Sequence, residues 1–202
     1  MQGRQFRAFG PIGVVNPSAW WNEVEVNLRG PLLYAHAVLP SMRARHRGRI
    51  INVASIAGVQ AIPALSAYVV SKTALIRFTE ALAQETAADG VQVFAIHPGT
   101  VRTPMNAYVH DSPEVAESAP HIQQWFRTLF AEGRDMPSSV PYTLCCDWPL
   151  AMPMRSPVVI FRWRMTLTRY LSSLLPAHLL SNACFASMES RRCLWGDQTA
   201  WI

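Results

Sequence analysis

A tyrosine and a lysine four positions apart are the side chains of this 202-residue chain best suited to acid–base chemistry. Tyr68 and Lys72 fall in a segment with helical apolar spacing, so both are expected on one helix face. A neighbouring ammonium favours the phenolate and lowers the pKa of a tyrosine, which is ordinarily about 10. Such a tyrosine can serve as a general acid or base near neutral pH. Lys72 is also the only lysine in the chain.

The pair is predicted to lie within a strand–helix–strand unit. Residues 50–54 form a short apolar run, residues 66–88 carry apolar side chains at helical spacing, and residues 91–96 form a second apolar run. Gly90 supplies a signal for the C-terminal end of the helix. This order predicts two parallel strands joined by a right-handed crossover.

Polar, turn-forming residues follow both predicted strands. Ser55 comes directly after the first strand, and residues 97–103 follow the second with the sequence His-Pro-Gly-Thr-Val-Arg-Thr. Ligands of open α/β sheets bind outside the carboxyl ends of the strands. We therefore expect Ser55 to meet Tyr68 and Lys72 at this edge and to hydrogen-bond a substrate oxygen. A role as a turn or helix cap is the structural alternative for Ser55.

A longer helix is predicted over residues 17–46. Asn16-Pro17-Ser18 is a helix start signal, and Pro31 predicts a kink or break inside the helix. Four arginines between positions 43 and 49 follow at its end. They lack the interleaved aromatic residues of a nucleic-acid stacking platform, so we interpret them as a solvated helix end and expect no nucleic-acid partner.

Composition places the chain among globular proteins. Half of its residues are hydrophobic and 15% are charged, which excludes a disordered chain. No window reaches the roughly 18 uninterrupted apolar residues of a membrane span. The first ten residues contain no apolar signal region, so a cytoplasmic location is expected. Cys145-Cys146 has no second pair at zinc spacing, and no metal site is predicted.

Composition shifts near residue 136, and all four cysteines lie beyond that point. Before it, one helix is predicted to open at Ser112-Pro113-Glu114, and residues 122–126 are predicted to continue a second helix. We interpret residues 136–202 as an atypical tail. Two explanations for this tail remain open: its translation out of frame, and a segment without a settled fold. A membrane-surface helix within residues 158–195 is a weaker alternative.

Four motifs in order resemble the short-chain dehydrogenase/reductase family. Tyr68 to Lys72 is similar to its Y-x-x-x-K motif, with Ser55 thirteen positions before the tyrosine. Asn27-Leu28-Arg29-Gly30 is similar to its N-x-x-G segment. Residues 98–103 resemble its P-G-x-x-x-T turn. The resemblance covers roughly residues 10–135, and the family's fold is a doubly wound, Rossmann-like parallel sheet.

The resemblance implies hydride transfer between NAD(P) and a small carbonyl or alcohol substrate. Tyr68 would transfer the proton, Lys72 would lower the pKa of Tyr68 and bind the nicotinamide ribose, and Ser55 would polarise the substrate oxygen. Asn27 would hold a water molecule of a proton relay. Four further residues would line the nicotinamide: Pro98, Gly99, Val101 and Thr103. The region from Pro104 to about Asp135 would be the substrate lid.

Family members begin with a glycine-rich turn that holds the cofactor pyrophosphate. This sequence contains no G-x-x-x-G-x-G and no N-N-A-G. Residues 1–135 are therefore interpreted as the catalytic half of a partial Rossmann-like α/β domain whose first βαβαβ half is missing. The chain alone is expected to bind dinucleotide weakly. The alternative is a non-catalytic fragment that acts through dimer contacts of the helices at 17–46 and 66–88. The substrate, the direction of the reaction and the choice of NAD or NADP stay open.

Overall fold

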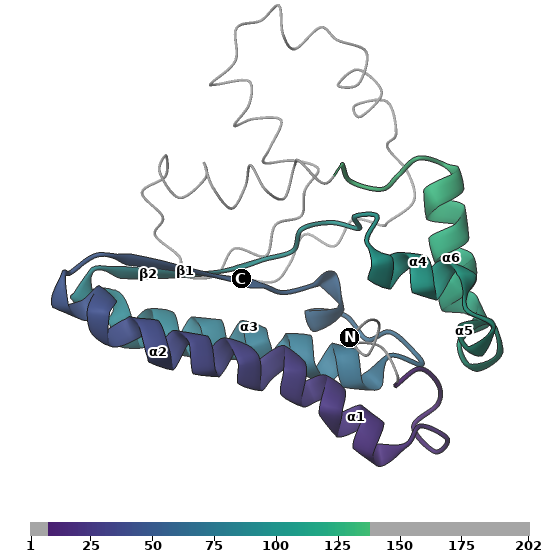
Figure 1. The fold of residues 1–202 in the computed structure, drawn as a ribbon, viewed down its shortest axis with the longest axis horizontal. Helices are drawn as coiled ribbons and strands as arrows, with labels where there is room; N and C mark the ends of the chain where they lie inside the picture. Colours follow the sequence, from purple (N-terminus) through teal and green to yellow (C-terminus); the bar gives the residue numbers. More distant parts are fainter. Residues whose placement is uncertain (1–7, 138–202) are drawn as a thin grey trace, which may run out of the picture. The chain divides into compact units, whose positions relative to one another are not determined.

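The computed structural model describes residues 8–137, which form a partial Rossmann-like α/β unit (Figure 1). Strands β1 (Gly48–Val53) and β2 (Val91–Ile96) pair in parallel, in a register that runs from Gly48 opposite Val91 to Val53 opposite Ile96. Helix α3 (Ser66–Thr86) connects them. The predicted strand–helix–strand unit and its parallel pairing are confirmed. Apart from its first two residues, the predicted tail 136–202 lies outside the described residues.

The predicted helix over residues 17–46 consists of three consecutive segments. They are α1 (Pro17–Val24), the π-helical turn η1 (Glu25–Arg29) and α2 (Gly30–Ala44). The Asn16 side chain caps α1 by accepting hydrogen bonds from the backbone N–H groups of Ser18 and Ala19 at 2.9 and 3.2 Å. The π-helical turn ends at Arg29, two residues before Pro31, whose missing N–H removes one hydrogen bond of a regular helix.

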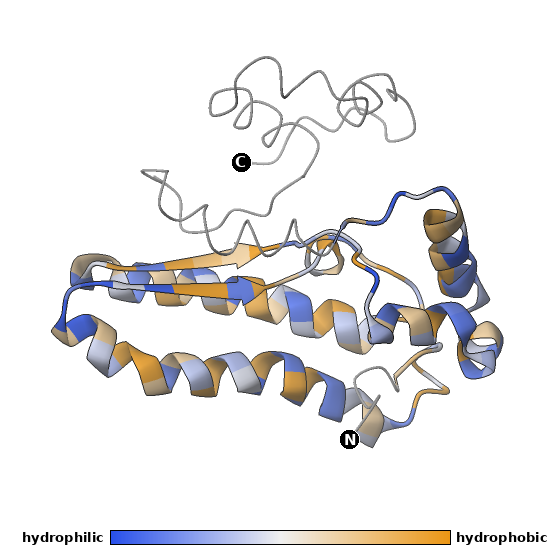
Figure 2. Cartoon of the chain, turned by 45° about the horizontal axis from the view of Figure 1, so that its top comes forward, coloured by the Kyte–Doolittle hydropathy of each residue, from blue (hydrophilic) through white to orange (hydrophobic). Residues whose placement is uncertain are grey.

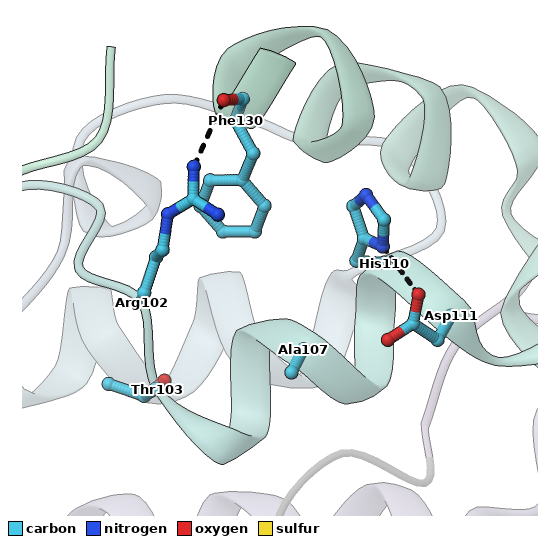
Figure 3. Close-up of a pocket in the computed structure, with 6 residues that line it drawn as sticks. All are labelled: Arg102, Thr103, Ala107, His110, Asp111 and Phe130. Atoms are coloured by element: carbon cyan, nitrogen blue, oxygen red, sulfur yellow. Dashed lines mark hydrogen bonds and ion pairs between the residues drawn. The ribbon is translucent and has the colours of Figure 1, made fainter. Parts of the chain in front are cut away.

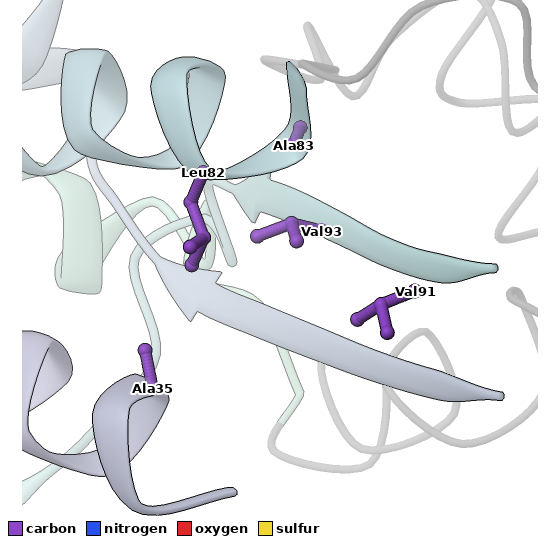
Figure 4. Close-up of a cluster of buried hydrophobic side chains, with 5 residues drawn as sticks. All are labelled: Ala35, Leu82, Ala83, Val91 and Val93. Carbon is purple, nitrogen blue, oxygen red and sulfur yellow. The ribbon is translucent and has the colours of Figure 1, made fainter. Parts of the chain in front are cut away.

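One hydrophobic cluster joins the two strands to α2 and α3. Its buried residues are Ala35, Leu82, Ala83, Val91 and Val93 (Figure 4). Figure 2 shows that hydrophobic residues also run along both strands. Ile50 of β1 is partly buried against this cluster, and burial of these apolar side chains removes apolar area from water, which stabilises the packing of α2 and α3 on the sheet.

The turn between α3 and β2 depends on a glycine. Helix α3 continues into the short 3-10 turn η3 (Ala87–Asp89), and Gly90 then adopts φ +70°. A Cβ atom at Gly90 would lie 2.4 Å from the His46 carbonyl oxygen, so the turn packs directly against the backbone that leads into β1. Both the left-handed conformation and the close approach favour glycine there.

Gly90→Ala is expected to lower the free energy of unfolding by about 1–3 kcal/mol, because alanine is strained at positive φ and its Cβ collides with backbone. Urea denaturation measures the change. Gly13→Ala is the matched control, since a Cβ atom at Gly13 meets nothing within 4 Å. Equal stability of the two variants would contradict the packing of this turn.

Three helices follow β2. They are α4 (Pro104–Asp111), α5 (Pro113–Ser118) and α6 (Pro120–Ala131). The last two match the predicted helices, whereas α4 was not predicted as a helix. Its start signal is Thr103-Pro104, in which the Thr103 hydroxyl accepts a hydrogen bond from the Asn106 backbone at 3.3 Å. No helix within the described residues is long and apolar enough to cross a membrane.

Candidate active site

The register of the two strands brings the predicted site segments to one edge of the sheet. Val53 lies opposite Ile96, and the Ala54 backbone N–H donates to the Ile96 carbonyl at 2.8 Å. Ser55 and residues 97–103 therefore leave the sheet from neighbouring positions. This is the carboxyl edge at which α/β folds bind ligands.

Tyr68, Lys72 and Ser55 come together at this edge. The Ser55 side chain hydrogen-bonds with Tyr68. The Lys72 ammonium lies 5.6 Å from the centre of the Tyr68 ring and donates a 3.0 Å hydrogen bond to the Val53 carbonyl. A hydroxyl, a phenol and an ammonium from three separate stretches of sequence thus form one cluster.

Close packing holds Lys72 in this position. The short 3-10 turn η2 (Ile56–Gly58) follows Ser55 and packs on α3. A Cβ atom at Gly58 would lie 2.9 Å from the Lys72 carbonyl oxygen and 2.5 Å from the Ile76 side chain. Only a glycine lets the backbone of η2 approach α3 this closely, so the distance between Ser55 and the lysine is set by backbone contact.

Ser55 also acts as a cap, which is the structural role predicted as the alternative to substrate binding. Its Oγ accepts a hydrogen bond from the Ala57 backbone N–H at 3.2 Å and caps η2. The hydroxyl keeps one proton to donate, which is the atom that can serve Tyr68 or a substrate oxygen. The cap and the contact with Tyr68 are therefore compatible, because they use different parts of the hydroxyl group.

The prediction that Lys72 lowers the pKa of Tyr68 is wrong for this structure. Burial raises the pKa of Tyr68, the hydrogen bond from Ser55 opposes this rise, and the charge of Glu23 adds to it. Burial likewise lowers the pKa of Lys72 to about 8. The lysine Nζ hydrogen-bonds with Val53, so it is directed to a carbonyl rather than to the phenol oxygen.

Asn27 lies beside this cluster, in the π-helical turn η1. Its side-chain amide donates to the Ser71 hydroxyl at 3.1 Å, and that hydroxyl donates to the Tyr68 carbonyl at 2.8 Å. Asn27 therefore contacts α3 at the residue next to Lys72. The irregular turn changes the helical register there, as π-helical turns often do at functional sites.

The segment after β2 forms a bent loop. Gly99 has φ +76°, and a Cβ atom there would lie 2.5 Å from the Met136 side chain. Val101 forms a parallel bridge with Met136. Thr103 caps α4, which is the turn-ending role expected for an isolated threonine. Pro98 and these three residues follow β2 at the carboxyl edge of the sheet.

The sequence analysis did not identify Glu23, a carboxylate of α1 that is only 7% exposed. Burial raises the pKa of Glu23 to about 7, with opposing contributions from the Lys72 charge and from a hydrogen bond with the Ala8 backbone. The signal available in the sequence was a charged residue next to Val24 on the apolar face of a predicted helix. Its electrostatic interaction with Lys72 depends on the packing of α1 against α3, which spacing alone does not reveal.

A pocket of about 260 Å³ lies at the start of α4 (Figure 3). Its lining residues are Arg102, Thr103, Ala107, His110, Asp111 and Phe130. The Arg102 guanidinium lies 4.7 Å from the centre of the Phe130 ring and donates to Asp135 at 2.7 Å. Asp135 therefore balances the charge of Arg102 at the edge of this pocket. The pocket belongs to the region that the resemblance assigns to the substrate lid.

Solved structures confirm the fold. A short-chain dehydrogenase from Streptomyces avermitilis superposes with a TM-score of 0.59 at 22% identity, over 91% of this chain and 66% of that one. A gluconate 5-dehydrogenase from Burkholderia cenocepacia, solved with NADP and tartrate, has a TM-score of 0.50 at 28% identity, over 55% of this chain and 44% of that one.

Sequence relatives belong to the same group. A short chain dehydrogenase of Pseudocercospora fijiensis is 35% identical over 132 residues, which are 63% of this chain and 42% of the relative. A cyclopentanol dehydrogenase of Comamonas testosteroni is 36% identical over 108 residues, 54% of this chain and 43% of the relative. The chain thus spans less than half the length of these relatives. The family model for short chain dehydrogenases matches residues 6–114, just over half of the chain. The chain therefore belongs to the short-chain dehydrogenase family.

Proposed function

We propose that this chain carries the proton-transfer centre of an NAD(P)-dependent oxidoreductase that interconverts a small alcohol and the corresponding carbonyl compound. The observation that supports this most directly is the cluster of Ser55, Tyr68 and Lys72 at the carboxyl edge of the parallel strands. Family membership makes oxidoreductase chemistry the expected use of such a cluster.

The chain's own residues would handle the proton. Tyr68 donates its phenolic proton to a carbonyl oxygen during reduction and accepts it back during oxidation. Ser55 hydrogen-bonds the same oxygen and holds it next to the phenol. Lys72, whose ammonium lies 5.6 Å from the centre of the Tyr68 ring, would bind the cofactor beside this phenol. Asn27 would hold a water molecule that returns the proton from solvent.

The cofactor would be NAD or NADP, and its nicotinamide, when bound, donates or accepts the hydride. Lys72 and Tyr68 would supply ammonium and hydroxyl donors to the ribose, and Thr103 would supply a hydroxyl to the carboxamide. Pro98, Gly99 and Val101 would line the ring from the loop after β2. A related gluconate 5-dehydrogenase structure holds NADP. These donors fit the nicotinamide end of a dinucleotide, whereas the sequence lacks the glycine-rich turn for the pyrophosphate.

We expect the 202-residue chain to bind NADPH and NADH weakly, because the nicotinamide end alone supplies few of the contacts that a dinucleotide needs. Fluorescence titration of each reduced cofactor against the purified chain measures this. Micromolar binding would contradict the expectation and would mean that residues other than the missing motif hold the pyrophosphate.

Substrate oxidation tests the proposed function itself. A relative is a cyclopentanol dehydrogenase, so cyclopentanol and other small secondary alcohols are suitable probes. Formation of reduced nicotinamide, followed by its absorbance at high NAD or NADP concentration, is the expected result. A chain that forms the described fold and transfers no hydride with any of these alcohols would contradict the proposal.

A second candidate function is association without catalysis, through helices within the predicted ranges 17–46 and 66–88. It is favoured by the exposed apolar side chains of α2, where Leu32, Leu33 and Tyr34 are 49%, 57% and 77% exposed. Consecutive helix positions point about 100° apart, so these three side chains expose apolar area over a broad side of α2, and large exposed apolar areas mark interaction surfaces. A second copy of the chain, or a full-length relative, would bury this face.

Leu33→Asp is expected to raise the dissociation constant for self-association of the chain by at least about tenfold, because it places a charge in an apolar contact. Analytical ultracentrifugation over a range of concentrations measures the change. Val14→Asp is the matched control, because Val14 is 81% exposed and lies outside these helices. Association that is equally strong in wild type and in Leu33→Asp would exclude this face.

A further inference from the structure

Glu23 is a buried carboxylate, and its burial lowers the stability of the fold unless another group compensates for it. Its side chain is 7% exposed, and its Oε1 atom has no hydrogen-bond partner among the described residues. The Ala8 backbone hydrogen-bonds with the carboxylate group, which leaves it only partly satisfied. A buried, incompletely bonded carboxylate destabilises a protein unless a compensating charge lies near it.

The placement of Glu23 is defined by two hydrogen bonds on either side of it. The Trp20 indole donates to the Ser66 hydroxyl at 2.9 Å, and the Asn27 amide donates to the Ser71 hydroxyl at 3.1 Å. Both bonds join the α1–η1 segment to the first turns of α3. Glu23 lies between these two anchors, so its carboxylate is next to the stretch of α3 that carries Tyr68.

We propose that Glu23 is a positioning residue of the active site, which supplies the negative charge that keeps Lys72 protonated in a buried environment. The relevance of this role to catalysis rests on the proposed function; the charge interaction itself does not. Glu23 would act through Lys72 and need not touch substrate or cofactor.

The electrostatics agree with this geometry. Burial lowers the pKa of Lys72 to about 8, and the charge of Glu23 opposes this change. Burial raises the pKa of Glu23 to about 7, and the charge of Lys72 opposes that change in turn. Each group thus stabilises the charged form of the other. Between about pH 7 and pH 8, both groups are predominantly charged, and each charge favours the other.

The other groups around the pair do not replace Glu23. Tyr68 is neutral in this range because burial raises its pKa, and His97, which follows β2, is neutral because burial lowers its pKa. The turns η1 and η2 contribute Asn27 and Ser55, which do not ionise here. Glu25 and Arg29 of η1 are exposed and pair with each other. Glu23 is therefore the acidic group that acts on Lys72 among the described residues.

The single lysine of the chain makes a direct test available. Lysine labelled with ¹³C at Cε gives one side-chain signal, which belongs to Lys72 without further assignment. In the full wild-type chain this signal is expected to titrate with a midpoint of about 8. In Glu23→Gln the midpoint is expected to fall by about one pH unit, because the buried ammonium loses its opposite charge. Neither cofactor nor substrate is needed.

Glu25→Gln is the matched control. Glu25 is an exposed glutamate two residues away, and its removal should leave the Lys72 midpoint unchanged. Glu23→Asp keeps the charge but withdraws it by one methylene, so its midpoint should lie between those of wild type and Glu23→Gln. This variant also tests the proposal if Glu23→Gln does not fold. Thermal unfolding of each variant establishes that the fold is retained.

Two results would overturn the proposal: a Lys72 midpoint that is the same in Glu23→Gln and wild type, or one that rises to the ordinary lysine value of 10.5 in the folded variant. The proposed function can fail separately. If the midpoint falls as expected while the chain transfers no hydride, the charge pair stands and the oxidoreductase proposal does not. If hydride transfer occurs and the midpoint does not move, the oxidoreductase proposal stands and the role of Glu23 does not.

Discussion

Replacing Tyr68 by phenylalanine is expected to lower the rate of hydride transfer by about 10²- to 10⁴-fold. The phenol is the group placed to give a proton to the substrate oxygen, and positioned acid–base catalysis contributes about this much. The ring and its packing on α3 are retained in Tyr68→Phe, so the fold should survive. Initial rates of alcohol oxidation at high NAD or NADP concentration measure the loss.

Tyr34→Phe is the control for this experiment. Tyr34 lies on α2 and is 77% exposed, so loss of its hydroxyl should leave the rate unchanged. A Tyr68→Phe variant as active as wild type would show that another group transfers the proton. A lower rate with unfolding at the same denaturant concentration as wild type would assign the effect to chemistry rather than to stability.

Replacing Lys72 by methionine is expected to remove activity and to stabilise the protein. Lys72 is partly buried, and the partial loss of water around its ammonium destabilises the folded state, whereas methionine fills similar space without charge. Below pH 7, where Glu23 holds its proton, we expect the free energy of unfolding to rise by about 1–2 kcal/mol. Hydride transfer should fall at the same time, because the proposed site loses the ammonium that would bind the nicotinamide ribose.

The pH dependence of this stabilisation has a definite sign. The folded wild-type chain favours neutral lysine, because burial lowers the pKa of Lys72 from its ordinary 10.5 to about 8. The unfolded wild-type chain therefore binds more protons between pH 8 and pH 10.5, and wild-type stability rises with pH in that window. Lys72→Met lacks this rise. Its advantage is thus largest below about pH 7, where Glu23 is neutral, and is lost as the pH approaches 10.5.

Denaturant unfolding at several pH values measures these differences. Arg77→Met is the control on the same helix, since Arg77 is exposed and pairs with Glu80. Exposed pairs contribute little, so its effect should stay within about 0.5 kcal/mol at every pH. A Lys72→Met variant that is less stable than wild type below pH 7 would mean that the bond from Lys72 to the Val53 carbonyl outweighs the cost of burying the charge.

Local sequence patterns were sufficient for the elements that position the site. Apolar runs defined β1 and β2, helical spacing defined α3, and Gly90 marked the turn between them. These features depend on residues close together in the chain, which is why they can be predicted. Helix α4 was missed because its start signal, Thr103-Pro104, had been interpreted as part of a ligand-binding turn.

The sequence by itself determined the family, the parallel order of β1 and β2, and the candidate residues Asn27, Ser55, Tyr68 and Lys72. Residue type and spacing along the chain carry that information. Only the tertiary structure decided the protonation of the site, because pKa values depend on burial and on charges that distant segments bring close. Packing of α1 on α3 buries Glu23 and couples it electrostatically to Lys72, and the same burial raises the pKa of Tyr68 where spacing alone predicted a fall.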